Sequence, residues 1–113
     1  MGKPSYFEFG SKNPDKTAKF FQKVFGWKTA RWEDKEWGVY WHMKTGGIKG
    51  GVYKSSRPEI DLTISVKSLD KTIAKIKKLG GKIVTSRTEM GDWGAYATLK
   101  DPMGNKFSVM EEY

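Results

Sequence analysis

Two acidic residues stand inside short apolar segments of this 113-residue chain. Glu8 alternates with Phe7 and Phe9, and Asp61 precedes an alternating run over residues 62–66. Because successive side chains of a strand point to opposite faces, the apolar residues should face a core and the carboxylates the opposite side. Burial and mutual repulsion in one cavity would raise the pKa of at least one carboxyl group, which suits a general acid or base. Glu8 and Asp61 are therefore the candidate catalytic residues.

The same alternation predicts the lining of a small-molecule cavity around these two carboxylates. The predicted ligand-binding residues are Tyr6, Glu8, Asp61, Thr63, Ser108 and Met110. The competing interpretation is that both carboxylates are solvated or paired with nearby lysines. Such pairing would leave two ordinary acids and no catalytic inference.

Other residue types offer less chemistry. The chain has no cysteine, which excludes disulfides, thiolate metal sites and cysteine nucleophiles. Its single histidine, His42, has the right unperturbed pKa for a general base, but the strand pattern does not tell which face it occupies, and a structural or surface role is the alternative. Gly46-Gly47 and Gly50-Gly51 do not lie between a strand and a helix start, so they do not predict a phosphate site. No nucleophile elbow is present.

Three segments of the chain recur at a nearly constant spacing, 55 residues for the first two and 56 for the third. They pair residues 12–17 with 67–72, Gly26 with Gly81, and residues 37–40 with 93–96. A shift of one residue is an ordinary loop difference, so the chain contains two copies of one structural unit. Trp37 and Trp93 are equivalent in this repeat. We interpret both as fold elements at hairpin entries, with stacking on a planar ligand as the alternative.

Each copy predicts one helix among four strands. The first helix begins at Pro14 after the N-cap Asn13 and ends at Gly26, and the second begins after the N-cap Ser68 and ends at Gly80. Their buried faces are expected to carry Ala18, Phe21, Val24 and Phe25 in the first helix and Leu69, Ile73, Ile76 and Leu79 in the second. The expected strands cover residues 5–10, 27–32, 38–44 and 50–54, then 60–66, 82–88, 93–100 and 106–111.

These elements predict an α+β fold of two tandem βαβββ units. A four-stranded sheet with one helix can cover only one of its faces, so two units together should form a curved eight-stranded mixed sheet with helices outside and a concave ligand cavity. We expect a single domain over residues 1–113, with repeats at 4–54 and 59–113 and a linker at 55–58.

The motifs that carry a family resemblance lie in both halves. They are residues 6–9, Asn13-Pro14, Phe20-Phe21 and residues 24–27, followed by Gly80-Gly81-Lys82 and residues 101–107. With these motifs the chain resembles the vicinal-oxygen-chelate superfamily of glyoxalases, bleomycin-resistance proteins and dioxygenases, in its branch of predicted enzymes related to lactoylglutathione lyase. The resemblance implies the paired βαβββ fold and, often, a homodimer. It implies no single reaction, because members include metal-dependent enzymes and non-catalytic drug-binding proteins.

The resemblance also locates four positions at which members of the superfamily hold a metal ion. By motif and repeat they fall on Tyr6, Asp61, approximately Val52, and Ser108. Only Asp61 is a credible ligand, whereas a divalent site of this type needs three or four oxygen or nitrogen donors. We therefore expect no bound metal, no cofactor and no metal-dependent reaction.

Charge and composition limit the partners. The net charge is +8, carried mostly by lysine, which indicates either a lysine-rich coat or attraction of anionic partners. No long apolar run predicts a membrane span or signal peptide, so we expect a cytoplasmic protein. The leading hypothesis is a metal-independent enzyme or binder of an anionic or aromatic small molecule. The alternatives are a ligand-sequestering protein of the bleomycin-resistance kind and, with less support, a nucleic-acid-associated basic protein.

Overall fold

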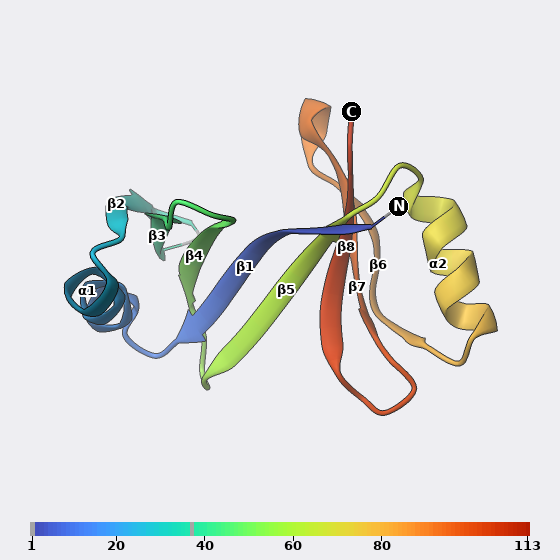
Figure 1. Cartoon of the computed structure of the whole chain (residues 1–113), viewed down its shortest axis with the longest axis horizontal. Coiled ribbons are helices and arrows are strands. Elements are labelled where there is room, and N and C mark those ends of the chain that lie inside the picture. The colour runs from blue at the N-terminus through green and yellow to red at the C-terminus, as the bar shows by residue number, and fades with distance from the viewer. Residues whose placement is uncertain (1, 37) are drawn as a thin grey trace. The chain divides into compact units, whose positions relative to one another are not determined.

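A computed structural model describes residues 2–36 and 38–113, so the interpretation of Trp37 lies outside the described residues. The described residues form eight strands, two α-helices and one short 3-10 helix (Figure 1). In chain order the elements are β1 (Lys3–Ser11), α1 (Pro14–Phe25), β2 (Lys28–Asp34), β3 (Gly38–Lys44), β4 (Lys49–Lys54), β5 (Glu59–Ser65), α2 (Leu69–Lys78), β6 (Lys82–Glu89), η1 (Gly91–Trp93), β7 (Gly94–Lys100) and β8 (Lys106–Glu112). Both helices start where the sequence predicts, and the strand ends agree with the prediction to within two residues.

The strands belong to one mixed sheet in the order β2-β3-β4-β1-β5-β8-β7-β6, which is not closed into a barrel. This confirms the predicted α+β class with an eight-stranded mixed sheet. The chain divides into two compact units, residues 6–61 and residues 1–5 with 62–113. We call them the first and second unit. Within the described residues, no helix combines the length and apolar character needed to span a membrane.

The first unit is built on the strands β2-β3-β4-β1, in which β4 runs parallel to β1 and the other neighbours are antiparallel. Helix α1 is fixed at both ends by its sequence. The Asn13 side chain accepts a hydrogen bond of 3.1 Å from the Lys16 N–H. Gly26 ends the helix at φ 72°, a left-handed conformation that glycine adopts without strain.

The helix-covered side of the first unit holds its core. The buried residues are Ala18, Trp41, Met43 and Val52, and Phe7, Phe9, Phe21, Trp27 and Val39 pack against them. The Phe21 ring stacks on Phe9 at a centroid distance of 4.7 Å and on Trp27 at 5.5 Å. The prediction that Val24 and Phe25 are buried is wrong, because they are 55% and 58% exposed. Phe25 is covered only on the side where it stacks on Phe21 and Trp27.

The second unit is built on the strands β5-β8-β7-β6, in which β5 runs parallel to β8. Ser5, near the start of β1, is hydrogen-bonded to Ser65 of β5 at 2.7 Å between the two Oγ atoms. The core contains Leu69, Ala95, Ala97, Leu99 and Val109, with Val66, Ile73, Ile76 and Phe107 packed against it. Leu79 was predicted to be buried and is 67% exposed. It caps the end of α2, where the chain turns away into Gly80.

An arginine ties the start of α1 to the edge strand β2. Arg31 Nε lies 3.0 Å from Asp15 Oδ1, and Arg31 Nη1 lies 2.8 Å from Glu33 Oε1. The indole Nε1 of Trp41 also donates to Asp15 Oδ1, at 2.7 Å. The carboxylate in the first turn of α1 therefore joins the helix to β2 and to β3.

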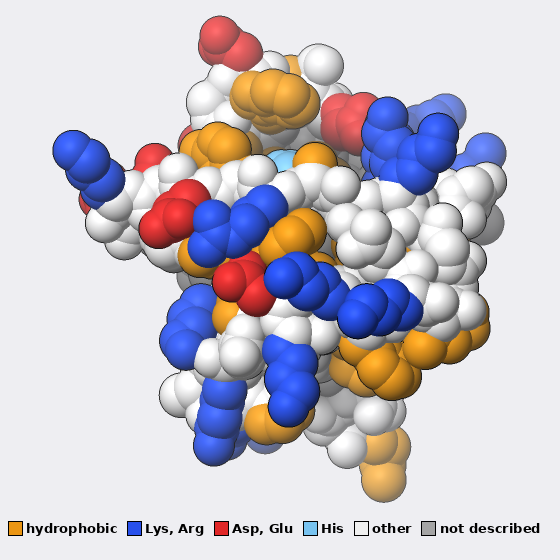
Figure 2. Space-filling view, turned by 90° about the vertical axis from the view of Figure 1, so that its left-hand side faces the viewer, with side chains coloured by type: hydrophobic (Ala, Val, Ile, Leu, Met, Phe, Trp, Pro, Cys, Tyr) orange, Lys and Arg blue, Asp and Glu red, His pale blue; other side chains and the backbone are white. Residues whose placement is uncertain are grey.

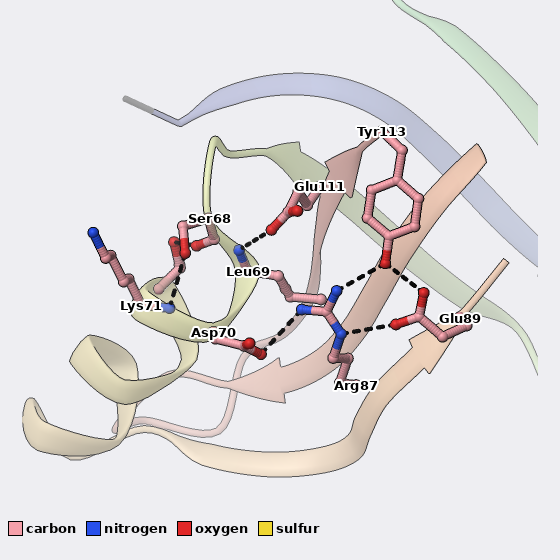
Figure 3. Close-up of polar contacts among 9 residues, drawn as sticks. Ser68, Leu69, Asp70, Lys71, Arg87, Glu89, Glu111 and Tyr113 are labelled. Carbon is pink, nitrogen blue, oxygen red and sulfur yellow. Dashed lines mark hydrogen bonds and ion pairs between the residues drawn. The ribbon is translucent and has the colours of Figure 1, made fainter. Parts of the chain in front are cut away.

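The second unit repeats this contact with its own arginine (Figure 3). Arg87 Nη1 lies 3.0 Å from Asp70 Oδ1 in the first turn of α2, and Arg87 Nε lies 2.8 Å from Glu89 Oε2. Arg87 Nη2 also donates to the Tyr113 hydroxyl oxygen at 2.8 Å. We call these two arrangements the arginine clamps. The repeat in the sequence contains their residues, although sequence analysis did not single them out.

Candidate active site

The side of the first unit's sheet that α1 does not cover carries the candidate chemistry. Phe7 and Phe9 pack into the helix-covered core as predicted, so Tyr6 and Glu8 lie on the other side. We call that side the open face of the first unit. The strand register places Glu8 next to Gly51, and Gly51 next to His42. Paired residues of neighbouring strands share a face, so His42 lies on the open face with Glu8.

Three side chains on the open face form one hydrogen-bonded chain. The Tyr40 hydroxyl donates to Glu8 Oε2 at 2.7 Å. The Tyr6 and Tyr40 hydroxyl groups are also hydrogen-bonded to each other. An ionised Glu8 can only accept, so the Tyr40 hydroxyl donates a hydrogen bond to Glu8 and the Tyr6 hydroxyl donates one to Tyr40. When Glu8 is protonated, the chain can run in the opposite direction, from Glu8 through Tyr40 to Tyr6. The hydrogen-bonded chain can therefore accommodate both the ionised and the protonated form of Glu8.

Burial changes the acidity of all three groups. Burial raises the pKa of Glu8 above its usual value, the hydrogen bond from Tyr40 lowers it in part, and the negative charge of Asp61 raises it further. Burial is also the main reason that the pKa values of Tyr40 and Tyr6 are raised, with the Glu8 charge acting in the same direction. Both tyrosines therefore remain hydroxyl donors throughout the ordinary pH range. Glu8 is the group whose proton can be exchanged.

Two adjacent glycines in β4 make room for aromatic rings on opposite sides of the strand. A Cβ atom at Gly51 would lie 1.8 Å from the Tyr40 hydroxyl oxygen. A Cβ atom at Gly50 would lie 2.3 Å from the Phe7 ring, on the helix-covered side. Only glycine allows such close approach of a ring to the backbone. The Gly50-Gly51 pair therefore positions Tyr40 on the open face.

The register also corrects one of the four positions at which the superfamily holds metal. Val52 is fully buried in the helix-covered core. The β4 residue beside Glu8 is Gly51, and its counterpart beside Thr63 is Ser108. The estimate from the sequence was one residue off, and a shift of one residue in a strand exchanges its faces.

The four positions therefore carry Tyr6, Gly51, Asp61 and Ser108. Such a set offers one carboxylate, two hydroxyl groups and one residue without any donor, which does not fit a divalent metal ion. Within residues 2–36 and 38–113, no group of three or more His, Cys, Asp or Glu side chains could hold one. The donors at these positions therefore give no support to a metal-dependent reaction.

Asp61 acts on Glu8 through its charge. Its Oδ1 atom is buried, and its charge raises the pKa of Glu8. The neighbouring acid Glu59 accepts a hydrogen bond of 2.8 Å from the Tyr53 hydroxyl. The structure thus brings Tyr6 and Glu8 together through Tyr40, with Asp61 within electrostatic reach. The predicted lining residues Thr63, Ser108 and Met110 lie in the second unit.

A pocket of about 490 Å³ opens beside the hydrogen-bonded chain. Its lining consists of Trp32, Gly38, Val39, Tyr40, His42, Tyr53 and Lys54. Trp32 lies opposite Tyr40 on the neighbouring strand, and Tyr40 lies opposite Tyr53. The exposed His42 ring packs edge-on against Tyr40 at a centroid distance of 4.9 Å. Aromatic surface with a few polar groups is typical of small-molecule sites. We call it the aromatic pocket.

Sequence analysis missed Tyr40, Trp32 and Tyr53 as site residues. One signal for Tyr40 was available, because Tyr40 and His42 alternate with the apolar Trp41 and Met43. The second signal is a strand glycine, Gly51, which lies opposite His42 and within reach of the Tyr40 ring. Using it requires the register between β3 and β4 to be known. That register comes from long-range pairing, which one strand's sequence does not contain.

The open face of the second unit carries small hydroxyl groups in the equivalent row. Thr63 lies beside Ser108, and Ser108 lies beside Thr98. The Thr98 and Ser108 hydroxyl oxygens are hydrogen-bonded at 2.9 Å. Thr98 and Ser108 therefore bond to each other, and the row of Thr63, Ser108 and Thr98 contains no carboxylate.

Comparison with known proteins identifies the family of this chain. The model of the Glyoxalase-like domain matches residues 7–110, so the chain belongs to this family. A protein named "Putative glyoxylase CFP32" from Mycobacterium tuberculosis, and its counterpart from Mycobacterium bovis, are 27% identical to the chain over 109 residues. The match covers 92% of this chain and 42% of theirs, so the chain spans less than half the length of these relatives.

Solved structures share the fold at low sequence identity. Protein BH1468 from Bacillus halodurans superposes with a TM-score of 0.79 at 14% identity, covering 100% of this chain and 96% of that one. Methylmalonyl-CoA epimerase from Mycobacterium tuberculosis gives a TM-score of 0.72 at 11% identity, covering 97% and 87%. Together with the family match, these structures confirm the vicinal-oxygen-chelate superfamily.

Proposed function

We propose that this chain is a small-molecule enzyme of the Glyoxalase-like family that moves a proton to and from its ligand without a metal ion. The observation that supports the proposal best is the hydrogen-bonded chain Tyr6–Tyr40–Glu8, which joins the aromatic pocket to a carboxyl group of raised pKa. A raised pKa makes the carboxylate a better base and allows the acid form to exist nearer neutral pH.

The proposed step is a proton abstraction from a carbon next to a carbonyl group. As the C–H bond breaks, its proton passes to the Tyr40 hydroxyl oxygen while the Tyr40 proton passes to Glu8 Oε2, so that Glu8 gains the O–H bond. The electron pair of the C–H bond moves onto the carbonyl oxygen to form an enolate. Return of the proton restores the carboxylate, so the cycle needs no oxidant, reductant or other reactant. Tyr40, which lines the pocket and donates to Glu8, couples the carboxyl group to the bound ligand.

The aromatic pocket suggests which ligands to test. Trp32 and His42 present exposed rings on which a planar group can stack. Methylmalonyl-CoA epimerase, which shares the fold, has been solved in complex with methylmalonyl-CoA. A first panel therefore contains aromatic carbonyl compounds, small keto acids and short acyl-CoA thioesters.

Proton NMR in D2O tests the proposed step without a known product. The expected result is loss of the α-proton signal of at least one panel compound with the wild-type protein. Glu8→Gln and Tyr40→Phe should both lose the exchange, because Tyr40 is the link between Glu8 and the aromatic pocket. Thr63→Val, at the equivalent position of the second unit, should leave it unchanged. Exchange that continues in Glu8→Gln would remove Glu8 as the base.

The alternative function is binding of a ligand without turnover. The aromatic pocket favours it, since stacking on Trp32 and His42 requires no proton transfer. A compound that raises the melting temperature equally in wild type and Glu8→Gln, and exchanges no proton in either, would support a ligand-sequestering protein. A ligand present at about 100 times its Kd stabilises the folded state by about 2.7 kcal/mol, which such a screen detects.

The predicted homodimer and the absence of metal remain proposals with direct tests. Exposed apolar residues on the edge strand β6, Ile83 at 38% and Val84 at 50%, would gain from being covered. Light scattering is expected to give twice the chain mass at micromolar concentration, and one chain mass would refute the dimer. Elemental analysis after dialysis is expected to find no stoichiometric transition metal, and about one ion per chain would refute that expectation.

A further inference from the structure

A larger groove lies on another part of the first unit. Its volume is about 850 Å³, and it lies between the start of α1, the end of β1 and the start of β5. The apolar part of its lining consists of Phe9, Phe20, Phe21, Pro58 and Ile60. Phe20 and Ile60 are 58% and 70% exposed, which is unusual for large apolar side chains of one concave surface. We call it the α1 groove.

Most polar side chains of the α1 groove are already occupied in holding its walls. The Ser11 and Thr17 hydroxyl oxygens are 2.7 Å apart, and Ser11 Oγ accepts from the Asn13 N–H at 3.0 Å. Asn13 Oδ1 caps the helix at the Lys16 N–H. Glu59, on the opposite wall, accepts from the Tyr53 and Ser55 hydroxyl groups. These groups fix the shape of the groove and leave little hydrogen-bonding capacity for a ligand.

The remaining polar groups of the lining are cationic. Lys12 and Lys16 both line the α1 groove, and among the ion pairs of the described residues neither ammonium group takes part. With Glu59 as the single acid in the lining, the side chains of the groove carry a net positive charge. Figure 2 shows the same combination on the side of the molecule that carries α1, where hydrophobic side chains lie exposed between lysine and arginine side chains.

We propose that the α1 groove binds an amphipathic carboxylate, with its apolar tail against Phe20 and Ile60 and its head group near Lys12 and Lys16. The apolar walls account for the tail, and the unpaired ammonium groups select a negative head over a neutral one. This site is separate from the Tyr6–Tyr40–Glu8 chain and does not depend on the function proposed for that chain.

Binding of sodium decanoate, with 1-decanol as an uncharged probe of equal chain length, tests the proposal by calorimetry or thermal shift. Decanoate should bind more tightly than decanol. Lys12→Gln combined with Lys16→Gln should weaken decanoate roughly two- to tenfold, the range expected for two exposed ion pairs, and leave decanol unchanged. Ile60→Ser should weaken both probes. Lys77→Gln combined with Lys78→Gln, at two exposed positions of α2, is the matched control for the loss of two positive charges.

Three results would overturn the proposal. Equal affinities for decanoate and decanol in the wild type would show that the lysines do not recognise the head group. A dimer that Ile60→Arg converts to monomer, together with no decanoate binding, would show that a second copy of the chain covers the groove instead. Glu8→Gln should bind decanoate as the wild type does. Loss of decanoate binding in Glu8→Gln would mean that decanoate binds on the open face, and it would also refute the proposal of a separate site.

Discussion

The two units are alike on their helix-covered sides and differ on their open faces. In the first unit, one row across the open face contains Glu8, Gly51 and His42. The equivalent row of the second unit contains Thr63, Ser108 and Thr98. The first unit therefore has a carboxylate, an imidazole and a glycine that makes room for the Tyr40 ring, where the second unit has three hydroxyl groups.

On the helix-covered sides the two units use the same devices. Each helix starts at a side-chain N-cap, Asn13 or Ser68, and each has an acidic residue in its first turn that an arginine clamp holds. Each core has a fully buried aliphatic residue at the equivalent place in the third strand of its unit, Met43 or Leu99. The residues that determine the fold are therefore duplicated, whereas the residues that offer chemistry occur once. Folding and function can be altered separately in this chain.

The largest expected effect is a loss of stability from substitutions on the helix-covered sides, where the two units are alike. Met43→Ala and Leu99→Ala each remove a side chain that is at most 1% exposed, so each should lower the free energy of unfolding by about 2–5 kcal/mol. Chemical denaturation of both variants measures the two losses. A loss below about 1 kcal/mol in only one variant would mean that the two cores are not equivalent.

The next effect should separate the open faces. Gly51→Ala places a Cβ atom 1.8 Å from the Tyr40 hydroxyl oxygen, so the ring must move and the hydrogen bond to Glu8 is strained or lost. We expect a cost of about 1–3 kcal/mol in unfolding free energy and loss of proton exchange. The counterpart Ser108→Ala removes a hydrogen bond to Thr98 and should cost about 1 kcal/mol. Equal effects on exchange would contradict the assignment of chemistry to the first unit.

Sequence patterns predicted the duplicated features well. N-caps, helix-ending glycines and strand alternation are local signals. The element order could therefore be predicted, and so could the placement of Tyr6 and Glu8 on one face of β1 and of Phe7 and Phe9 on the other. The aromatic pocket and the role of Gly51 could not, because both depend on which residues of different strands lie side by side. The one-residue error at Val52 has the same origin, since its face is set by pairing with β1.

The pH dependence of stability should distinguish Glu8 from its counterpart Thr63. The pKa of Glu8 is raised in the folded protein from an ordinary value of 4.5. Ionisation is therefore harder in the folded state, and the wild type should lose stability as the pH rises from about 4.5 through the raised pKa. Glu8→Gln cannot ionise and still accepts from Tyr40, so it should lack this loss. Melting temperatures between pH 4 and pH 9 test this.

The control for this prediction is Thr63→Val, which should shift the melting temperature by the same amount at every pH. At pH 4 the wild type and Glu8→Gln should have nearly equal stability, and the variant should be the more stable at pH 8. A variant that is less stable than the wild type by a constant amount would mean that Glu8 is already well solvated or paired when ionised.

The smallest effects should come from the arginine clamps. The carboxylate partners of both clamps are substantially exposed, so solvent and salt screen these pairs. Arg31→Met and Arg87→Met should each lower the melting temperature slightly, and the difference from wild type should shrink in 1 M NaCl. Arg87→Met should have the larger effect. Arg87 is the less exposed of the two and also holds Tyr113, whereas Asp15 keeps the Trp41 indole as a donor when Arg31 is lost.

Stability at low pH distinguishes a specific Arg31–Asp15 contact from a general effect of removing one positive charge. Arg31 lowers the pKa of Asp15 below its ordinary value of 3.8, so the contact stabilises the fold above that pH and its contribution disappears as the pH falls through the lowered pKa. The stabilities of the wild type and Arg31→Met should therefore become equal in strong acid.

The control variant is Lys77→Met, which removes a charge without breaking an ion pair. Because the chain carries +8, relief of charge repulsion should make this substitution neutral or slightly stabilising. If Lys77→Met lowers the melting temperature as much as Arg31→Met does, the clamps are surface charges without a specific role, and the likeness of the two helix-covered sides rests on caps and cores alone.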